Sequence, residues 1–419
     1  MAATIAQKIM ARAAGVDAVS AGEIVWVTPD LVIAHDHNFP RYREAMRKAG
    51  AEHIKNPERL MLTIDHRPYS DDLKIVEARQ MMRADVKASG IGHFFDVGRH
   101  GISHNVPVDK GIVQPGMMVL TSDTRSPALG CVGAFAVALG GGLVTVLALG
   151  KTWLRVPATL KVVVSGTPQN GIMSRDMAGW IAQQISDERA DYRVIEFAGP
   201  LLAQLDMDQR HTFCNAMVDI GAKGAIVPAD RYTADYFAAL GHPGLHPVAS
   251  DPDADFEDVL HFDVSSLEPQ VALPPDPTNL VAVSKAAGEP VHQAFVGSCI
   301  GGKMEDLRAA ANILRGRKID PRVRLVIIPA TQDIFKRAAS EGLMEVFSGA
   351  NAYIAAGACG PCYGTLAPIA AGETCIGTST RNEPGRMGSP AGRVLIASAA
   401  TVAASAVRGV VTDPREFLA

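Results

Sequence analysis

The chain alternates between short apolar runs rich in β-branched residues and stretches with helical periodicity, and this alternation constrains its fold more than any other feature. Each apolar run ends in a polar or glycine-rich loop, as a buried strand of a parallel sheet does. Alternating strands and helices predict an α/β fold. The expected strands are Asp30–Ala34, Arg59–Ile64, Gly116–Thr121, Thr159–Ser165 and Arg324–Pro329, and the expected helices are Arg41–Lys48, Lys74–Lys87, Met304–Arg315 and Gln332–Glu341.

Two predicted boundaries divide the chain into candidate domains. Near Val156–Pro157 an apolar stretch gives way to the strand pattern TLKVVVSG, and the proline-rich residues Glu268–Asn279 are typical of an extended linker. A chain of 419 residues is too long for one ordinary hydrophobic core. We therefore predict three α/β domains, comprising residues 1–156, 157–278 and 279–419.

The composition excludes several classes of protein. A net charge of −4 is not that of a general nucleic-acid binder, and six cysteines in 419 residues are too few for a secreted disulfide scaffold. The N-terminal residues predict an amphipathic helix, not an export signal, so we expect a reducing, cytoplasmic location. Residues Val132–Gly150 are long enough for a membrane span, but Gly140, Gly141 and Gly142 interrupt them, which favours a buried helix and no membrane partner.

Three cysteines lie in glycine-rich turns. Cys299 lies in VGSCIGGKMEDLRAAANIL, and Cys359 and Cys362 lie in ACGPCYG. Glycine-rich turns let thiolates point at a shared inorganic centre while backbone N–H groups approach the sulfur atoms. A C-x-x-C pair alone is also consistent with a redox pair or half a zinc site. A redox pair would not need Cys299, however, and structural zinc would need a fourth nearby ligand.

An iron–sulfur cluster fits three cysteines in a particular way. Electron-transfer clusters are normally held by four cysteines, so three would leave one iron open to act as a Lewis acid on a substrate hydroxyl. The remaining cysteines, Cys131, Cys214 and Cys375, are expected to be small buried residues, with Cys375 the one to consider as a fourth ligand.

Two further motifs carry polar groups suited to acid–base chemistry and carboxylate binding. Asp65–His66 ends the predicted strand LMLTIDH, where α/β sheets often present functional side chains. Arg381 and Arg386 flank a loop that follows the cysteines, and guanidinium groups bind carboxylates at two points. On residue type alone, a structural histidine and two solvated arginines are the more common outcome.

The order and spacing of these motifs resemble the aconitase superfamily over the whole chain. GSCIGGKMEDLRAAA resembles the GSCTNG-x-x-EDLR segment of that superfamily, ACGPCYG its second cluster motif, and TSTRNEPGRMGSP its downstream arginine segment. Within it, the chain is most similar to short prokaryotic large subunits of the 3-isopropylmalate dehydratase, homoaconitase and dimethylmalate dehydratase type. The resemblance implies a three-domain aconitase-like core with the cluster site between domains, and a [4Fe-4S] cluster bound by Cys299, Cys359 and Cys362.

The resemblance also implies roles for the polar residues. His66 would protonate the leaving hydroxyl with support from Asp65. The further catalytic candidates are His104, Asp123 and Glu196, and the substrate-binding candidates are His35, Asp36, Arg125, Arg381 and Arg386.

The chain departs from the family pattern at several of these motifs. Asp123-Thr124-Arg125-Ser126 stands where the family usually has Asp-Ser-His-Thr, so a fixed cation replaces a histidine. Our hypothesis from the sequence is that Arg125 binds an additional or displaced substrate carboxylate. The other departures are Ile300 and Gly301 for the usual Thr-Asn, Thr380 for Asn, and Glu383 for an aromatic residue.

The implied function is a hydro-lyase that dehydrates and rehydrates a small hydroxy di- or tricarboxylic acid. The resemblance further implies a separate small subunit, a swivelling domain that supplies a serine base. One alternative is a hydratase for another malate-type acid, such as dimethylmalate, maleate or citraconate. A second is a non-catalytic cluster-bearing sensor, against which the acid–base and arginine groups argue; a zinc-bound structural protein is a more distant third.

Overall fold

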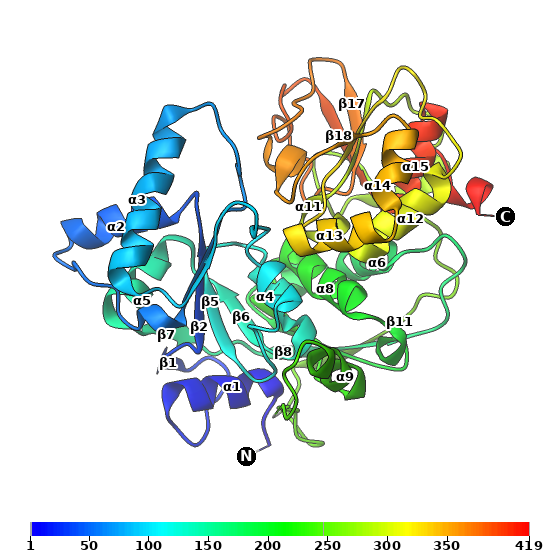
Figure 1. Cartoon of the computed structure of the whole chain (residues 1–419). Coiled ribbons are helices and arrows are strands. Elements are labelled where there is room, and N and C mark those ends of the chain that lie inside the picture. Colours follow the sequence, from blue (N-terminus) through cyan, green and yellow to red (C-terminus); the bar gives the residue numbers. More distant parts are fainter. Residues whose placement is uncertain (1, 246, 419) are drawn as a thin grey trace. The chain divides into compact units, whose positions relative to one another are not determined.

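The computed structural model describes residues 2–245 and 247–418 (Figure 1). Contacts between residues divide the chain into two compact units. Unit 1 comprises Met1–Val97, Ser103–Val164 and Asp187–Phe262, and unit 2 comprises Gly98–Ile102, Ser165–Ser186 and Asp263–Ala419.

The first sheet of unit 1 has five parallel strands in the order β4-β3-β2-β5-β6. Its register pairs His35 with Thr63 and Ile33 with Thr121, so the carboxyl ends of β2, β3 and β5 meet at one edge. The strands are β2 (Leu31–His35), β3 (Leu60–Thr63), β4 (His93–Phe95), β5 (Met118–Thr121) and β6 (Phe135–Ala138), and the neighbouring helices are α1 (Ile5–Ala14), α2 (Phe39–Lys48), α3 (Leu73–Ser89), α4 (Val106–Asp109) and α5 (Leu143–Leu149).

The core of this unit lies between that sheet and its helices. Ile9 of α1, Phe39 of α2 and Leu62 of β3 are completely buried in it. The apolar positions of α1 recur at helical spacing, and a capping box formed by Thr4 and Gln7 fixes where the helix begins. This packing holds the strand ends that carry the polar residues.

The second sheet of unit 1 has four strands in the order β10-β9-β8-β11, with β8, β9 and β10 parallel. After β9 the chain forms a helix, α8, that continues into the 3-10 turn η5. The elements are β8 (Thr159–Ser165), β9 (Val194–Ala198), α8 (Met207–Ala216), η5 (Met217–Ile220), β10 (Gly224–Ile226), α9 (Arg231–Ala239) and β11 (Asp258–Asp263). A separate antiparallel pair joins β1 (Ile24–Val27) and β7 (Thr152–Arg155).

Unit 2 is built on a seven-stranded sheet in the order β13-β12-β18-β17-β14-β15-β16. Strands β18, β17, β14, β15 and β16 are parallel, which brings the turns after β14, β16 and β17 to one edge of the sheet. The strands are β12 (Gln270–Ala272), β13 (Leu280–Ala282), β14 (Gln293–Val296), β15 (Arg324–Ile327), β16 (Tyr353–Ile354), β17 (Thr374–Gly377) and β18 (Arg393–Ala397), and the main helices are α6 (Ser174–Ile185), α11 (Ser298–Gly301), α12 (Met304–Leu314), α13 (Gln332–Ser340), α14 (Leu343–Gly349) and α15 (Ala399–Arg408).

The α/β fold class and all nine predicted strands and helices are confirmed, with boundaries shifted by a few residues. The prediction for Val132–Gly150 was wrong, because this stretch forms β6, the turn Gly140–Gly142 and the short α5 instead of one buried helix. The predicted linker Glu268–Asn279 contains β12, which pairs with β13 and β18. The three-domain division stays a prediction.

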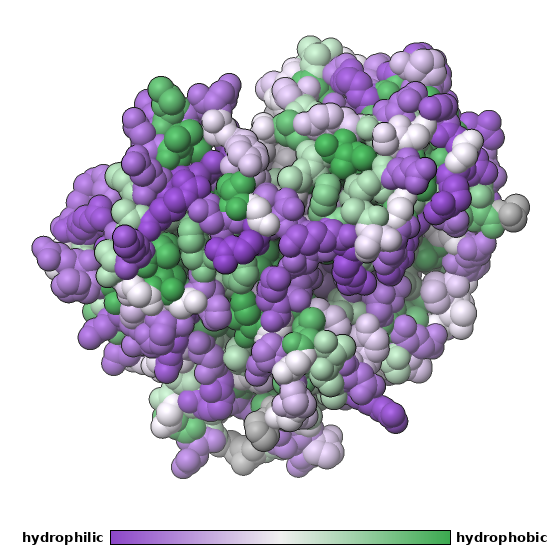
Figure 2. All heavy atoms as spheres, viewed as in Figure 1, coloured by the Kyte–Doolittle hydropathy of each residue, from purple (hydrophilic) through white to green (hydrophobic). Residues whose placement is uncertain are grey.

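Side-chain exposure follows the usual distribution for a packed protein. The face shown in Figure 2 is mostly hydrophilic, with apolar residues scattered over it. In the part of the chain that the structure describes, no helix combines the length and the apolar character that a membrane crossing requires.

Candidate active site

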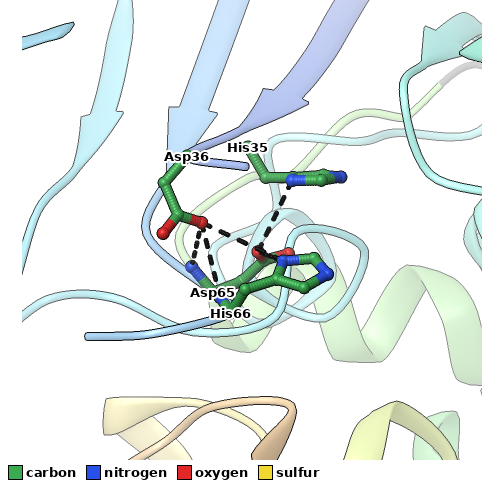
Figure 3. A group of neighbouring side chains, drawn as sticks. All are labelled: His35, Asp36, Asp65 and His66. Atoms are coloured by element: carbon green, nitrogen blue, oxygen red, sulfur yellow. Dashed lines mark hydrogen bonds and ion pairs between the residues drawn. The ribbon is translucent and has the colours of Figure 1, made fainter. Parts of the chain in front are cut away.

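Four predicted residues meet where β2 and β3 end (Figure 3). His35 is the last residue of β2 and Asp36 follows it, while Asp65 and His66 come two and three residues after the end of β3. All four are buried, and each offers a polar atom within 4.8 Å of the others. Parallel pairing of the two strands therefore brings together residues about 30 positions apart in sequence.

Asp65 and His66 form the central pair of this group. Oδ1 of Asp65 contacts Nδ1 of His66 directly, and Asp65 is completely buried. Burial alone would raise the pKa of Asp65, but the charges of His66 and His35 hold it well below its usual range. Burial disfavours the charged imidazole, yet the Asp65 carboxylate raises the pKa of His66 to about 9. His66 is therefore protonated at neutral pH.

Asp36 holds the main chain that carries this pair. Its Oδ1 accepts hydrogen bonds from the N–H groups of Asp65 at 3.1 Å and His66 at 3.4 Å, and its Oδ2 accepts one from Arg79 at 3.3 Å. Both oxygens are thus already used, so the contacts favour a positioning role over the predicted substrate-binding role. The four side chains are close enough for a divalent cation, but these bonds and the protonation of His66 favour acid–base chemistry.

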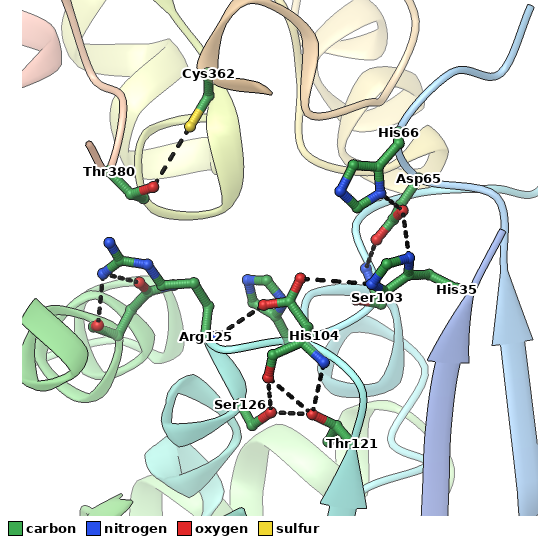
Figure 4. A network of polar contacts seen from close by, with 12 residues as sticks. His35, Asp65, His66, Ser103, His104, Thr121, Arg125, Ser126, Cys362 and Thr380 are labelled. Carbon is green, nitrogen blue, oxygen red and sulfur yellow. Dashed lines mark hydrogen bonds and ion pairs between the residues drawn. The ribbon is translucent and has the colours of Figure 1, made fainter. Parts of the chain in front are cut away.

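His35 lies between two carboxylates. Its Nδ1 is 3.7 Å from Oδ1 of Asp65, its Nε2 is 3.9 Å from Oδ2 of Asp123, and its ring centroid is 4.6 Å from that of His66. This residue therefore joins the Asp65–His66 pair to the segment that follows β5 (Figure 4).

His104 and Asp123 form a second pair in the same region. Nδ1 of His104 is 3.7 Å from Oδ1 of Asp123, and burial lowers the pKa of His104. Burial acts to raise the pKa of Asp123, but the charges of His104 and His35 lower it overall. Neither ring nitrogen of the buried His104 has a hydrogen-bond partner among the described residues, which is rare unless a ligand or water completes the site.

Arg125 is engaged by residues that the sequence did not identify. Its Nη2 donates to Oδ1 of Asp219 at 2.6 Å, and its Nη1 lies 3.3 Å from the carbonyl oxygen and 3.5 Å from Oδ1 of Asn215. The predicted carboxylate-binding role of Arg125 is untested, but protein acceptors already surround the guanidinium. Asn215 and Asp219 are spaced by four along α8 and η5, but no local pattern in the sequence links either of them to Arg125.

The contacts of Glu196 are with residues outside the two histidine–carboxylate pairs. It is on β9, where Oε2 accepts a hydrogen bond from Oγ of Ser250 at 2.6 Å, and burial raises the pKa of its carboxyl group. Lys161 and Lys8 are the charged groups that act on it. These contacts give no support to the predicted catalytic role of Glu196.

The three predicted cluster cysteines lie at one edge of the sheet of unit 2. Cys299 is in α11, directly after β14, while Cys359 and Cys362 border the 3-10 turn η6 (Gly360–Tyr363) after β16. Because α11 packs against η6, the two cysteine motifs are neighbours. No disulfide joins any of the six cysteines, all of which lie in the described ranges.

The turn that carries Cys299 depends on close backbone packing. Ser298 has a φ of 70°, and its Oγ donates to the carbonyl oxygen of Thr378 at 2.8 Å. A Cβ on Gly301 would lie 2.1 Å from Cβ of Thr378, so only glycine fits against this threonine. The buried Lys303 then fixes the turn by donating from Nζ to the carbonyl oxygen of Ile300 at 2.7 Å.

The predicted arginines lie beside the second cysteine motif. Nε of Arg386 donates to the carbonyl oxygen of Cys362 at 2.6 Å, and its guanidinium lies 5.3 Å from the ring centroid of Tyr363. Within the described residues, no side chain pairs with the guanidinium of Arg381. Oγ1 of Thr380 is 3.4 Å from Sγ of Cys362 (Figure 4). Arg175, which was not predicted from the sequence, donates to the carbonyl oxygen of Ser379.

The three predicted cluster cysteines do not form a single-ion site among the described residues. Among the described residues, the side chains gathered closely enough to share one ion are His35, Asp36, Asp65 and His66, and no cysteine is among them. Thiolates that hold a cluster bind different iron atoms and so stand further apart. Cys375 is completely buried in β17 and burial raises its pKa to about 12, which favours a structural thiol over a fourth ligand.

Comparison with known proteins identifies the family of the chain. The model of the aconitase family (aconitate hydratase) matches residues 7–290 and 279–409. The 3-isopropylmalate dehydratase large subunit 1 of Methanopyrus kandleri is 39% identical over all of both chains, and the probable methanogen homoaconitase large subunit of Methanothermobacter thermautotrophicus is 36% identical over 98% of this chain and 97% of its own.

A solved structure supports the fold alone. Aconitase X of Thermococcus kodakaraensis, in its holo form, superposes with a TM-score of 0.53 over 85% of this chain and 84% of its own, at 12% identity. The family match covers nearly the whole chain, and the family implies an iron–sulfur cluster. The resemblance seen in the sequence is therefore confirmed: the chain belongs to the aconitase family, and its activity is that of a hydro-lyase.

Proposed function

We propose that this chain is the large subunit of a two-subunit hydro-lyase of the 3-isopropylmalate dehydratase type. It removes and re-adds water on a small hydroxy di- or tricarboxylic acid at a [4Fe-4S] cluster held by Cys299, Cys359 and Cys362. The observation that carries this proposal is the buried contact between Asp65 and His66, which supplies a protonated imidazole at neutral pH.

The contacts of His66 support it as the proton donor. Nδ1 of His66 faces Asp65, so Nε2 on the opposite side of the ring is the atom that gives a proton to the departing hydroxyl. Asp65 keeps the imidazole charged, and Asp36 fixes the main chain of both residues. When bound, a cluster with three protein ligands supplies an open iron that polarises the carbon–oxygen bond.

Arg381 and Arg386 are suited to hold the substrate carboxylates. The guanidinium of Arg381 has no partner among the described residues, and Arg386 uses only Nε on the carbonyl group of Cys362, which leaves its two terminal nitrogens for a carboxylate. His104, with both ring nitrogens unsatisfied and a pKa lowered by burial, is a neutral donor or acceptor for the bound acid.

A small-subunit partner completes the proposal. The relatives that support it are named large subunits, and the matches cover the whole of this chain and of each relative. The partner, a swivelling domain, is proposed to bring a serine that takes the proton from the carbon next to the hydroxyl-bearing carbon. Return of water in the opposite orientation then gives net isomerisation.

A substrate panel and metal analysis test the proposal. Chain purified without oxygen, reconstituted with iron and sulfide, and combined with a small subunit from the same organism should bind iron and turn over 3-isopropylmalate. Citramalate, dimethylmalate, maleate and citraconate probe the alternative of another malate-type hydratase. Iron binding without turnover of any acid would instead favour the sensor, and absence of iron would refute the cluster assignment.

The partner requirement has its own test. Large subunit alone should show less than about one-hundredth of the activity of the reconstituted pair, because general base catalysis contributes on the order of 100-fold or more. Full activity of the isolated chain would refute the need for a partner while leaving the cluster assignment intact.

A further inference from the structure

The guanidinium of Arg125 is bound to one face of the helix that runs from α8 into η5. His211, Asn215 and Asp219 are spaced by four residues and so lie on the same side of this helix. Nε2 of His211 lies 3.3 Å from the carbonyl oxygen of His104, and Asn215 and Asp219 contact the guanidinium of Arg125. This face therefore contacts both segments that carry the second histidine–carboxylate pair.

Asp219 balances the charge of Arg125. The Arg125 side chain is 6% exposed and that of Asp219 is 10% exposed, and Nη2 of Arg125 is 2.6 Å from Oδ1 of Asp219. A buried guanidinium without a carboxylate would be strongly disfavoured, since removal of one partner leaves an uncompensated charge. The cation that replaces the usual family histidine is thus matched by an anion 94 residues further along the chain.

The same residue is tied to the acid–base group. The N–H of Arg125 donates to Oδ1 of Asp123 at 2.7 Å, and that oxygen is 3.7 Å from Nδ1 of His104. The positive charge of Arg125 is one of the causes that lower the pKa of His104, which indicates that the two groups are close enough to interact. Release of the guanidinium from Asp219 would leave a cation near residues that face the bound acid.

We infer that Asp219 is a positioning and specificity-determining residue: it holds and neutralises Arg125 against α8 and η5, so that this arginine adds no carboxylate-binding group to the active site. This inference rests on the proposed function and reverses the expectation that Arg125 itself reads a carboxylate. In the wild-type enzyme, two arginines, Arg381 and Arg386, then serve the substrate carboxylates, which favours a dicarboxylic acid over a tricarboxylic one.

The test replaces charges without changing side-chain size. Asp219→Asn keeps the shape of Asp219 and releases the charge of Arg125, and the double variant Arg125→Gln/Asp219→Asn removes both charges. Asp258→Asn is the matched control, because it breaks an exposed pair with Arg189 elsewhere in unit 1. For each reconstituted two-subunit enzyme, kcat and KM are measured with 3-isopropylmalate and homocitrate, and binding of inert succinate and tricarballylate is measured by calorimetry.

Asp219→Asn should raise the ratio of tricarballylate to succinate affinity about tenfold, as one new charge-assisted hydrogen bond would, with the change in KM and not in kcat. The double variant should restore the wild-type ratio. An unchanged ratio in Asp219→Asn would overturn the inference. If Asp219→Asn does not fold, the double variant decides: loss of the wild-type preference would show that Arg125 contacts substrate in the native enzyme. Failure of wild type to turn over any acid would refute the proposed function, whereas the calorimetric ratios would still test Asp219.

Discussion

Replacement of Asp65 by asparagine should lower the pKa of His66, so that the imidazole loses its proton near neutral pH. In the native protein the pKa of His66 is raised to about 9 from an ordinary 6.5, mainly by the contact with Asp65 against the effect of burial. This difference corresponds to about 3 kcal/mol between the two protonation states. Asparagine keeps the shape of the side chain but lacks the charge, so the pKa should return to 6.5 or lower because burial remains.

The expected loss of activity follows from the fraction of protonated His66. At pH 8, a pKa of about 9 leaves about 90% of the imidazole protonated, whereas a pKa of 6.5 leaves about 3%. Asp65→Asn should therefore lower kcat/KM at pH 8 by about 30-fold or more. It should also move the alkaline limb of the pH profile from near pH 9 to pH 6.5 or below.

The assay is the pH dependence of kcat/KM for the reconstituted two-subunit enzyme, followed by the absorbance of the unsaturated product. Histidine NMR gives an independent pKa of His66. Asp258→Asn, which changes an exposed aspartate, should behave like wild type. An alkaline limb that stays near pH 9 in Asp65→Asn would refute the assignment of Asp65 as the cause of the shift.

Three further predictions concern stability and the metal site. The folded-state pKa of His66 lies above its ordinary value, so the pair with Asp65 should stabilise the fold fully below about pH 6.5. About 3 kcal/mol of this stability should be lost as the pH rises through 9. Urea unfolding of wild type and Asp65→Asn at pH 6 and 9.5 measures this loss. Gly301→Asn, which restores the usual family residue, should cost about 1–3 kcal/mol because its Cβ would overlap Thr378, and an unchanged melting temperature would contradict this. Cys299→Ser should lower the iron content after reconstitution, whereas Cys375→Ala should retain it, and equal losses would implicate both thiols.

The sequence was sufficient for the fold class and for the elements that carry the motifs. Apolar runs such as Leu60–Thr63 are buried in parallel sheets, and the polar residues after them lie at the strand ends as parallel pairing requires. It failed for Val132–Gly150, because a short buried strand and a buried helix have the same apolar composition and periodicity cannot separate them. Only pairing with β5 decided that Phe135–Ala138 is a strand.

The site was predictable where its residues are neighbours in sequence, and less so where they are not. Asp65 and His66 are adjacent, so their contact could be expected from a strand-end motif. The partner of Arg125 is 94 positions away, and no local pattern links Asp219 to it. Asp36 was recognised as a polar residue near the site, but its use as an acceptor for two main-chain N–H groups depends on the register between β2 and β3.

The hydrogen bonds from the main chain of residues 65 and 66 to Asp36 have a practical consequence. Because Asp36 holds the main chain of residues 65 and 66 through their amide groups, exchange of the His66 side chain should leave the path of the loop intact. His66→Gln would then be an inactive enzyme that still admits its ligand. This variant can be incubated with a cell's small acids and crystallised with its partner. The acid bound in the crystal would identify the natural substrate directly.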